Sequence, residues 1–331
     1  TNARAIGAIN YASSDLVGRI IVRAMEKEGI KSGERRQIWA QRILGPFRVC
    51  VKKTKTYHEA GKCLETLQTD LVKNIGLAIG FEMVLQEMGA DYAKKVPAGY
   101  QRCLVSGGRS QDSRVKPCIV SSMRSAAENF GVDQVSVVAE KEVPAAAKAV
   151  AARVRPVFAG CLGKANDRAG FGACADTLVA TAGAEIASEA VKSNQQVQAY
   201  FPNLKARSKL AESAKSAFTA CMAEVKKKNQ RDDKGTLSTE SCALRVKLDA
   251  ASAVAKALFA SNLKNIQGLS KAQKNKIERS VSKQLDGCWN ATGSLEENNA
   301  CMRGAIETLV ASVAEVKLAV ELPATLRAKR P

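Results

Sequence analysis

Ten cysteines are the residues of this 331-residue chain whose type and spacing could do chemistry. Cysteine pairs can bind a metal, exchange electrons with other thiols, or form structural disulfides. Taken in order along the chain, they form five successive pairs: Cys50/Cys63, Cys103/Cys118, Cys161/Cys174, Cys221/Cys242 and Cys288/Cys301.

The spacing favours disulfides within the pairs. Zinc sites usually place ligands two to four residues apart or add histidines, whereas this chain has no C-x-x-C and one histidine, His58. A redox enzyme needs one reactive pair rather than five equivalent ones. An even number of cysteines at helix ends is typical of local disulfides in an oxidising compartment. Reduced thiols and metal binding remain alternatives, and ten cysteines allow many other connectivities.

The same helical pattern precedes each first cysteine. The residue three positions before it is large and apolar: Phe47, Tyr100, Phe158, Phe218 and Leu285. Seven positions before it stand Ile43, Val96, Val154, Ala214 and Val281. Steps of three and four place these side chains on one face of a helix that runs into the cysteine.

A second helical pattern follows each second cysteine, with apolar residues in steps of four. After Cys63 these are Leu67, Leu71, Ile75 and Ile79, whereas the stretch after Cys118 is the poorest copy. Each repeat therefore predicts helix, cysteine, polar loop, cysteine, helix. We expect an all-α fold of about eleven helices, in which disulfide-stapled helical-hairpin repeats form a bundle or a solenoid-like array.

The predicted helices fall into two sets. Helices that follow a cysteine pair, with an unpaired copy at the N-terminus, are expected at 5–27, 64–88, 118–130, 174–198, 242–262 and 301–321. Helices that precede a pair are expected at 34–49, 90–102, 135–160, 204–220 and 270–287. The helix breakers between them are Gly29 to Gly33, Gly89, Gly131, Pro202 with Asn203, and Gly268. Three prolines, Pro46, Pro97 and Pro156, are expected to kink or end the helix just before a disulfide.

No linker is long enough to force separate domains. We therefore expect one continuous helical repeat array over residues 1–331, with two packed bundles as the alternative. The repeats centre on 50–63, 103–118, 161–174, 221–242 and 288–301.

Composition indicates a basic protein outside the cytoplasm. The chain carries a net charge of +19 and 46% hydrophobic residues, and no apolar run approaches a membrane span. Residue 1 is Thr1, which we interpret as the start of a mature chain after signal-peptide removal, although a chain trimmed otherwise looks the same. Asn290 begins an N-glycosylation sequon in the last inter-cysteine segment. The expected location is secreted, or another oxidising compartment such as the periplasm.

Conventional catalytic motifs are missing from the sequence. It contains no G-x-S-x-G, no phosphate-binding G-x-x-x-x-G-K-[ST] and no H-E-x-x-H. His58 is expected to be a solvated loop residue. We therefore predict no catalytic, cofactor-binding or metal-binding residue, no cofactor, and a non-enzymatic protein.

The positive charge is concentrated at the N-terminus, where residues 1–60 hold twelve Lys+Arg against five Asp+Glu. Such a surface either keeps a protein soluble or attracts anionic partners such as polysaccharides, acidic proteins or lipid headgroups. Nucleic acid is not expected as a partner, because no reading element or set of stacking aromatics is visible.

Short windows around the cysteines resemble insect secreted helical proteins of the tsetse EP type. The windows are Tyr100-Gln-Arg-Cys103-Leu104, Phe158-Ala-Gly-Cys161-Leu162, Cys63-Leu-Glu-Thr-Leu67 and Cys174-Ala-Asp-Thr-Leu178. Proteins of this type usually carry additional cysteines that this chain lacks. The resemblance implies a secreted, non-enzymatic helical protein of poorly defined role, and it supplies no functional residue.

Two functions from different classes follow from these features. The leading hypothesis is a secreted structural or interaction protein that self-associates into an extracellular fibre, coat or matrix. The alternative is a carrier of a hydrophobic ligand, such as a lipid or pigment, in a cavity between helices. A cationic protein that binds anionic partners and an enzyme are the remaining possibilities.

Overall fold

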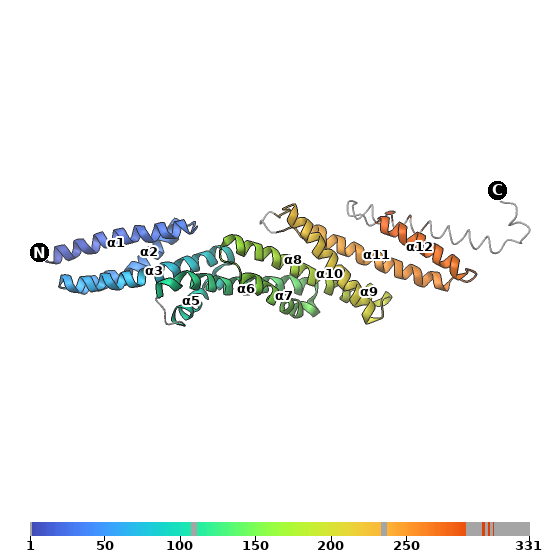
Figure 1. Cartoon of the computed structure of the whole chain (residues 1–331), viewed down its shortest axis with the longest axis horizontal. Coiled ribbons are helices and arrows are strands. Elements are labelled where there is room, and N and C mark those ends of the chain that lie inside the picture. Colours follow the sequence, from blue (N-terminus) through green and yellow to red (C-terminus); the bar gives the residue numbers. More distant parts are fainter. Residues whose placement is uncertain are drawn as a thin grey trace, which may run out of the picture. The chain divides into compact units, whose positions relative to one another are not determined.

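The computed structural model describes residues 2–106, 111–232 and 237–288, together with residues 300, 301, 304 and 307. Within these residues the fold is all-α, which confirms the predicted class, and the one β feature is an isolated bridge between Arg231 and Leu237. In chain order (Figure 1) the elements are α1 (Asn2–Lys27), α2 (Gly33–Lys53), α3 (Tyr57–Met88), α4 (Ala90–Ala93), α5 (Val96–Val105), the 3₁₀ helix η1 (Gln111–Arg114), α6 (Val115–Glu142), the 3₁₀ helix η2 (Pro144–Ala146), α7 (Ala147–Leu162), α8 (Arg168–Ser193), α9 (Gln195–Tyr200), α10 (Leu204–Lys227), α11 (Glu240–Asn265) and α12 (Lys271–Cys288).

The chain divides into two compact units. The first comprises Thr1–Gln134 and Arg155–Ala175, and the second comprises Val135–Val154 and Asp176–Pro331. The division falls inside helices α6, α7 and α8. The prediction of one continuous array over the whole chain stays a prediction.

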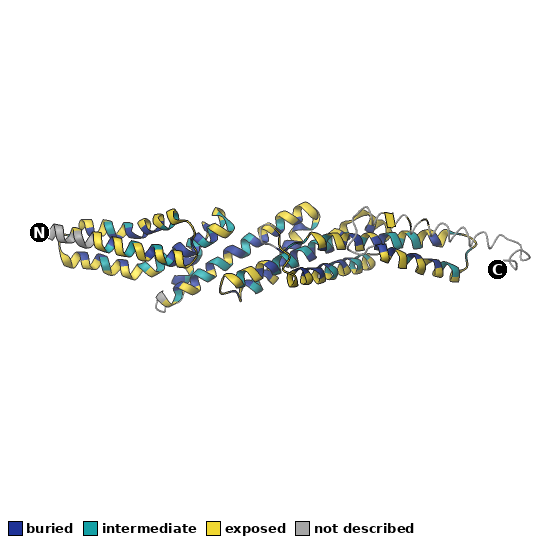
Figure 2. Cartoon of the chain, turned by 90° about the horizontal axis from the view of Figure 1, so that it is seen from above, coloured by how far each residue is buried: buried dark blue, intermediate teal, exposed yellow. Residues whose placement is uncertain are grey.

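The first unit begins with three helices that pack against one another. Helix α1 contacts both α2 and α3, and α2 contacts α3 (Figure 1). Their shared core contains Ile21 and Met25 of α1, Leu44 and Phe47 of α2, and Leu67 of α3, all buried. These residues recur in steps of three and four within each helix, so one apolar stripe per helix forms the core. Figure 2 shows the resulting division of each helix into a buried and an exposed face.

In the second unit, α10 packs on α11, and α11 packs on α12. Phe218 and Met222 of α10 share one core cluster with Val246 of α11. Leu263 near the end of α11 shares another with Ile277 and further residues of α12. Two consecutive helix pairs are thus joined through α11, since its two ends contribute to different cores.

Glycines permit close helix contacts at one place in each unit. In α3, a Cβ at Gly76 would lie 2.7 Å from the Tyr100 hydroxyl and 2.6 Å from Val115. In α8, a Cβ at Gly183 would lie 2.3 Å from the Phe218 ring. Tyr100 and Phe218 are the aromatic residues three positions before a first cysteine. Each therefore packs against the helix that ends the preceding hairpin, at a point where only glycine fits.

The predicted helix breaks are correct at three glycines and wrong at a fourth. Gly29, Gly89 and Gly268 adopt φ of 83°, 93° and 83°, in the left-handed region that favours glycine. Gly131, in contrast, lies inside α6, which continues to Glu142. A glycine inside a helix costs only about 1 kcal/mol. Buried residues on both sides of Gly131, including Ala127 and Val135, outweigh that cost.

Of the three prolines expected to kink or end a helix, two do not end theirs. Pro46 and Pro156 are exposed residues inside α2 and α7, which both continue past the cysteine. An interior proline costs about 3 kcal/mol. The buried neighbours on either side of Pro46, Ile43 and Phe47, anchor both halves of α2 in the same core. Pro97 lies in the first turn of α5, so the helix predicted at 90–102 is broken into α4 and α5.

Candidate functional site

All ten cysteines are paired, and the pairs are the five that the spacing predicts. The disulfides are Cys50–Cys63, Cys103–Cys118, Cys161–Cys174, Cys221–Cys242 and Cys288–Cys301. Their Cα–Cα distances lie between 5.4 and 5.8 Å, as in ordinary disulfides. No free thiol remains for redox or nucleophilic chemistry.

The first four disulfides close the tips of helical hairpins. They join α2 to α3, α5 to α6, α7 to α8, and α10 to α11. The large residue three positions before each first cysteine is buried in every repeat, with exposed fractions of 1 to 4%: Phe47, Tyr100, Phe158, Phe218 and Leu285. Each staple is thus placed within one helical turn of a core side chain, so it ties the tip of the hairpin to the packed interior.

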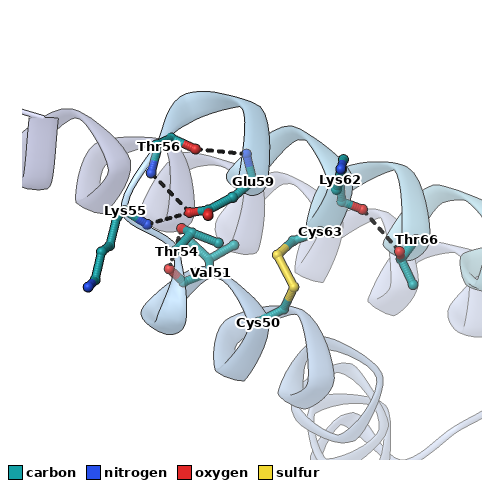
Figure 3. The surroundings of a disulfide bond; sticks show 9 residues. All are labelled: Cys50, Val51, Thr54, Lys55, Thr56, Glu59, Lys62, Cys63 and Thr66. Carbon is teal, nitrogen blue, oxygen red and sulfur yellow. Dashed lines mark hydrogen bonds between the residues drawn. A yellow bond between two sulfur atoms is a disulfide. The ribbon is translucent and has the colours of Figure 1, made fainter.

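The tip of the first hairpin, residues 50–63, has its own network of hydrogen bonds (Figure 3). Thr56 caps α3 by accepting a bond from the Glu59 amide at 3.2 Å, and the Glu59 carboxylate accepts bonds from the Lys55 and Thr56 amides at 2.7 and 3.2 Å. This capping box satisfies donors that a helix start leaves free. The bonds from the Lys55 and Thr56 amides hold the pKa of Glu59 below its usual value.

A buried carboxylate joins the same two helices elsewhere in the first hairpin. Glu82 of α3 is 0% exposed and accepts bonds from the Arg35 guanidinium, at 2.7 Å from both Nε and Nη2, and from Trp39 Nε1 at 2.6 Å. The hydrogen bond with Glu82 raises the pKa of Arg35. Because a buried charge is costly without partners, the three donors fix how α2 and α3 pair.

The second unit contains a comparable carboxylate in α8. Glu185 pairs with Arg153 of α7 at 2.6 Å and with Lys215 of α10 at 2.5 Å. Burial alone would raise the pKa of Glu185, but the hydrogen bonds from Lys215 and Arg153 outweigh it and lower that pKa. A single side chain therefore connects three helices.

The tip of the fourth hairpin is held by α8 rather than by a capping box. Arg231 in the α10–α11 loop donates from Nη1 and Nη2 to the two oxygens of Asp176, each at 3.0 Å. The bond to Asp176 raises the pKa of Arg231. Leu237, which pairs with Arg231 in the isolated bridge, is 2% exposed and belongs to the core of this hairpin. A polar and an apolar contact thus anchor the long loop.

The remaining site predictions have different outcomes. His58 is exposed, but it lies in the first turn of α3 rather than in a loop, because the capping box starts that helix at Tyr57. Asn290 lies outside the described residues. The described part of the chain holds no group of three or more His, Cys, Asp or Glu side chains arranged to bind a metal ion. None of its helices is both long and apolar enough to cross a membrane.

Sequence reasoning missed the buried carboxylates, although the pattern contains a signal for one of them. Glu82 stands three residues after Ile79, on the apolar stripe of α3, where a charged residue requires a buried partner. Nothing in the sequence pairs Asp176 with Arg231, because they are distant in the chain and belong to different elements.

No family model matches this chain, and neither the curated proteins nor the solved structures contain a significant match.

Proposed function

We propose that this chain is a secreted, non-enzymatic structural or interaction protein that self-associates through its helical surfaces. The observation that carries the proposal is the repeated staple: each disulfide lies next to a buried apolar residue at the end of a helix. Disulfides form and persist in oxidising compartments. A chain of this length can bury a core without five staples, so the extra covalent bonds serve durability outside the cell.

The close contacts between successive hairpins favour this function over transport of a hydrophobic ligand. Tyr100 fills the space above Gly76, and Phe218 fills the space above Gly183, with no room for even a methyl group. A carrier needs an apolar cavity that its own side chains leave open. At these two contacts between helices, the space is taken by the chain itself.

The outer surface of α1 offers an apolar contact for a second copy. Leu16 and Ile20 are 56% and 45% exposed and stand one helical turn apart. Adjacent apolar side chains form a continuous patch, whereas single exposed ones are ordinary. We therefore place a self-association contact on this part of α1.

Light scattering and electron microscopy of the full chain over a range of concentrations test the proposal. We expect concentration-dependent assemblies that weaken in the double variant Leu16→Gln, Ile20→Gln. The matched control is Leu244→Gln, Leu258→Gln, which removes two exposed leucines that stand apart. A protein that stays monomeric at high concentration contradicts self-association. Native mass spectrometry that finds a co-purifying lipid or pigment favours the carrier instead.

A further inference from the structure

We propose that the tip of the first hairpin binds a sulfated polysaccharide through four lysines, Lys52, Lys53, Lys55 and Lys62, named here the basic tip. All four are exposed. They lie between or beside two cysteines whose Cα atoms are 5.8 Å apart, so the disulfide gathers them at one end of the hairpin. This inference rests on the extracellular location in the proposed function.

The four lysines form no ion pair among the described residues, although the Glu59 carboxylate interacts electrostatically with Lys55. None of the ion pairs in the described part of the chain includes them. The one carboxylate between the two cysteines, Glu59, is directed to the Lys55 and Thr56 amides, where it caps α3. The Lys55 side chain extends away from this turn (Figure 3). The basic tip therefore keeps a net positive charge available to an external anion.

Helix stabilisation accounts for only part of this cluster. Lys52 and Lys53 occupy the last turn of α2, where cations interact favourably with the helix dipole. Lys55 lies in the turn between the helices, and Lys62 lies in the second turn of α3, near the end that the dipole makes unfavourable for a cation. Neither Lys55 nor Lys62 stabilises a helix through its dipole, yet both add positive charge to the same surface.

A further exposed positive charge lies on α2 beyond the basic tip. Arg42 is exposed and stands eleven positions before Lys53, on the same face of the helix. At a rise of about 1.5 Å per residue, these two charges are about 16 Å apart along α2. Arg42 and the basic tip thus place positive charge at both ends of this stretch, where two separated anionic groups of one polysaccharide chain can be bound.

A lipid surface is a poorer match for the same residues. Peripheral membrane helices bury an apolar face in the headgroup region. Between the two cysteines, the exposed side chains are the four lysines, Thr56, His58 and Glu59, with Tyr57 as the one large aromatic. The charges can attract an anionic surface, but too little apolar area accompanies them to insert into it.

Heparin is the probe that tests the site, with the full oxidised chain applied to a heparin column and titrated in solution at several salt concentrations. In the tip variant, all four lysines of the basic tip are replaced by Gln. The control variant carries Lys271→Gln, Lys276→Gln, Arg279→Gln and Lys283→Gln, four exposed positions of α12. Both lose the same net charge, and circular dichroism verifies that both remain helical.

We expect the tip variant to bind heparin about tenfold or more weakly at about 0.15 M salt, with a shallower salt dependence, because fewer counterions are released. The control should stay within about twofold of the parent. Equal losses in both variants, or no loss in the tip variant, would overturn the site. A tip variant that loses binding to phosphatidylserine vesicles but keeps heparin binding would assign the tip to lipid and also overturn the proposal.

Light scattering of the tip variant separates this inference from the proposed function. If the variant loses heparin binding but still self-associates, both ideas stand. If the parent binds heparin through the tip yet stays monomeric, only self-association fails.

Discussion

The first and fourth hairpins share the same disulfide staple but differ in what else holds them. In the first, which also packs against α1, the tip is ordered by its own capping box at Thr56 and Glu59, and Glu82 of α3 bonds to Arg35 and Trp39 of α2. The fourth is held from outside. Arg231 in its loop is bonded to Asp176 of α8. Lys215 of α10 is bonded to Glu185, which also belongs to α8.

This difference follows from the segment between the cysteines. The sequence separation is 13 residues in the first hairpin and 21 in the fourth. A short turn can be ordered by neighbouring residues, whereas a longer one loses more conformational entropy on ordering and needs contacts from elsewhere. The comparison teaches that one repeated sequence unit can order its tip either with its own residues or through a bond from another helix.

The largest expected effect comes from removing each staple. Cys50→Ser with Cys63→Ser, and Cys221→Ser with Cys242→Ser, should each lower the stability of their own hairpin by about 3 kcal/mol, and the longer loop should lose about 0.4 kcal/mol more. Amide hydrogen exchange measures the free energy of opening in α2 and α3 separately from that in α10 and α11. Unchanged protection in the hairpin that lost its staple would contradict the prediction.

The second effect concerns the internal bond of the first hairpin. Glu82→Gln removes the charge that pairs with Arg35 and should lower the free energy of opening of α2 and α3 by about 2 kcal/mol. The control is Glu87→Gln, whose pair with Arg168 is exposed on both sides, and it should change little. Equal effects of the two variants on the free energy of opening would contradict a stabilising role for the burial of the Glu82 ion pair.

A smaller effect is expected at the anchor of the fourth hairpin. Asp176→Asn weakens both bonds to Arg231 and should reduce protection in the loop and at the start of α11 by about 1.5 kcal/mol. Asp286→Asn, whose exposed carboxylate pairs with the half-buried Lys256, serves as the control and should cost less than about 0.5 kcal/mol. If the loop is unaffected, Leu237 alone anchors it.

The smallest effect compares the two helix caps directly. Thr56→Ala should destabilise α3 by about 1 kcal/mol, because it removes the acceptor for the Glu59 amide. Thr239 stands at the same position before α11 but makes no capping bond with its side chain, so Thr239→Ala should be close to neutral. Amide exchange in the first turn of each helix reads out both. A loss at Thr239 as large as that at Thr56 would remove this distinction between the hairpins.

Local chemistry determined much of this protein from the sequence alone. The cysteine spacing and the apolar residues at minus three and minus seven predicted the staples, the all-α class and buried residues such as Phe47 and Val154. Gly29, Gly89 and Gly268 marked real helix ends, because glycine is favoured at positive φ. These features depend on residues close together in the chain, and periodicity records them directly.

Tertiary structure decided what local preference could not. It carried α6 through Gly131 and kept Pro46 inside α2, since packing of neighbouring residues outweighed the local cost. It also chose the distant partners, Arg35 for Glu82 and Arg231 for Asp176, which no spacing rule connects. The free energy of a buried ion pair depends on which helices meet, and that is fixed only when the whole chain has folded.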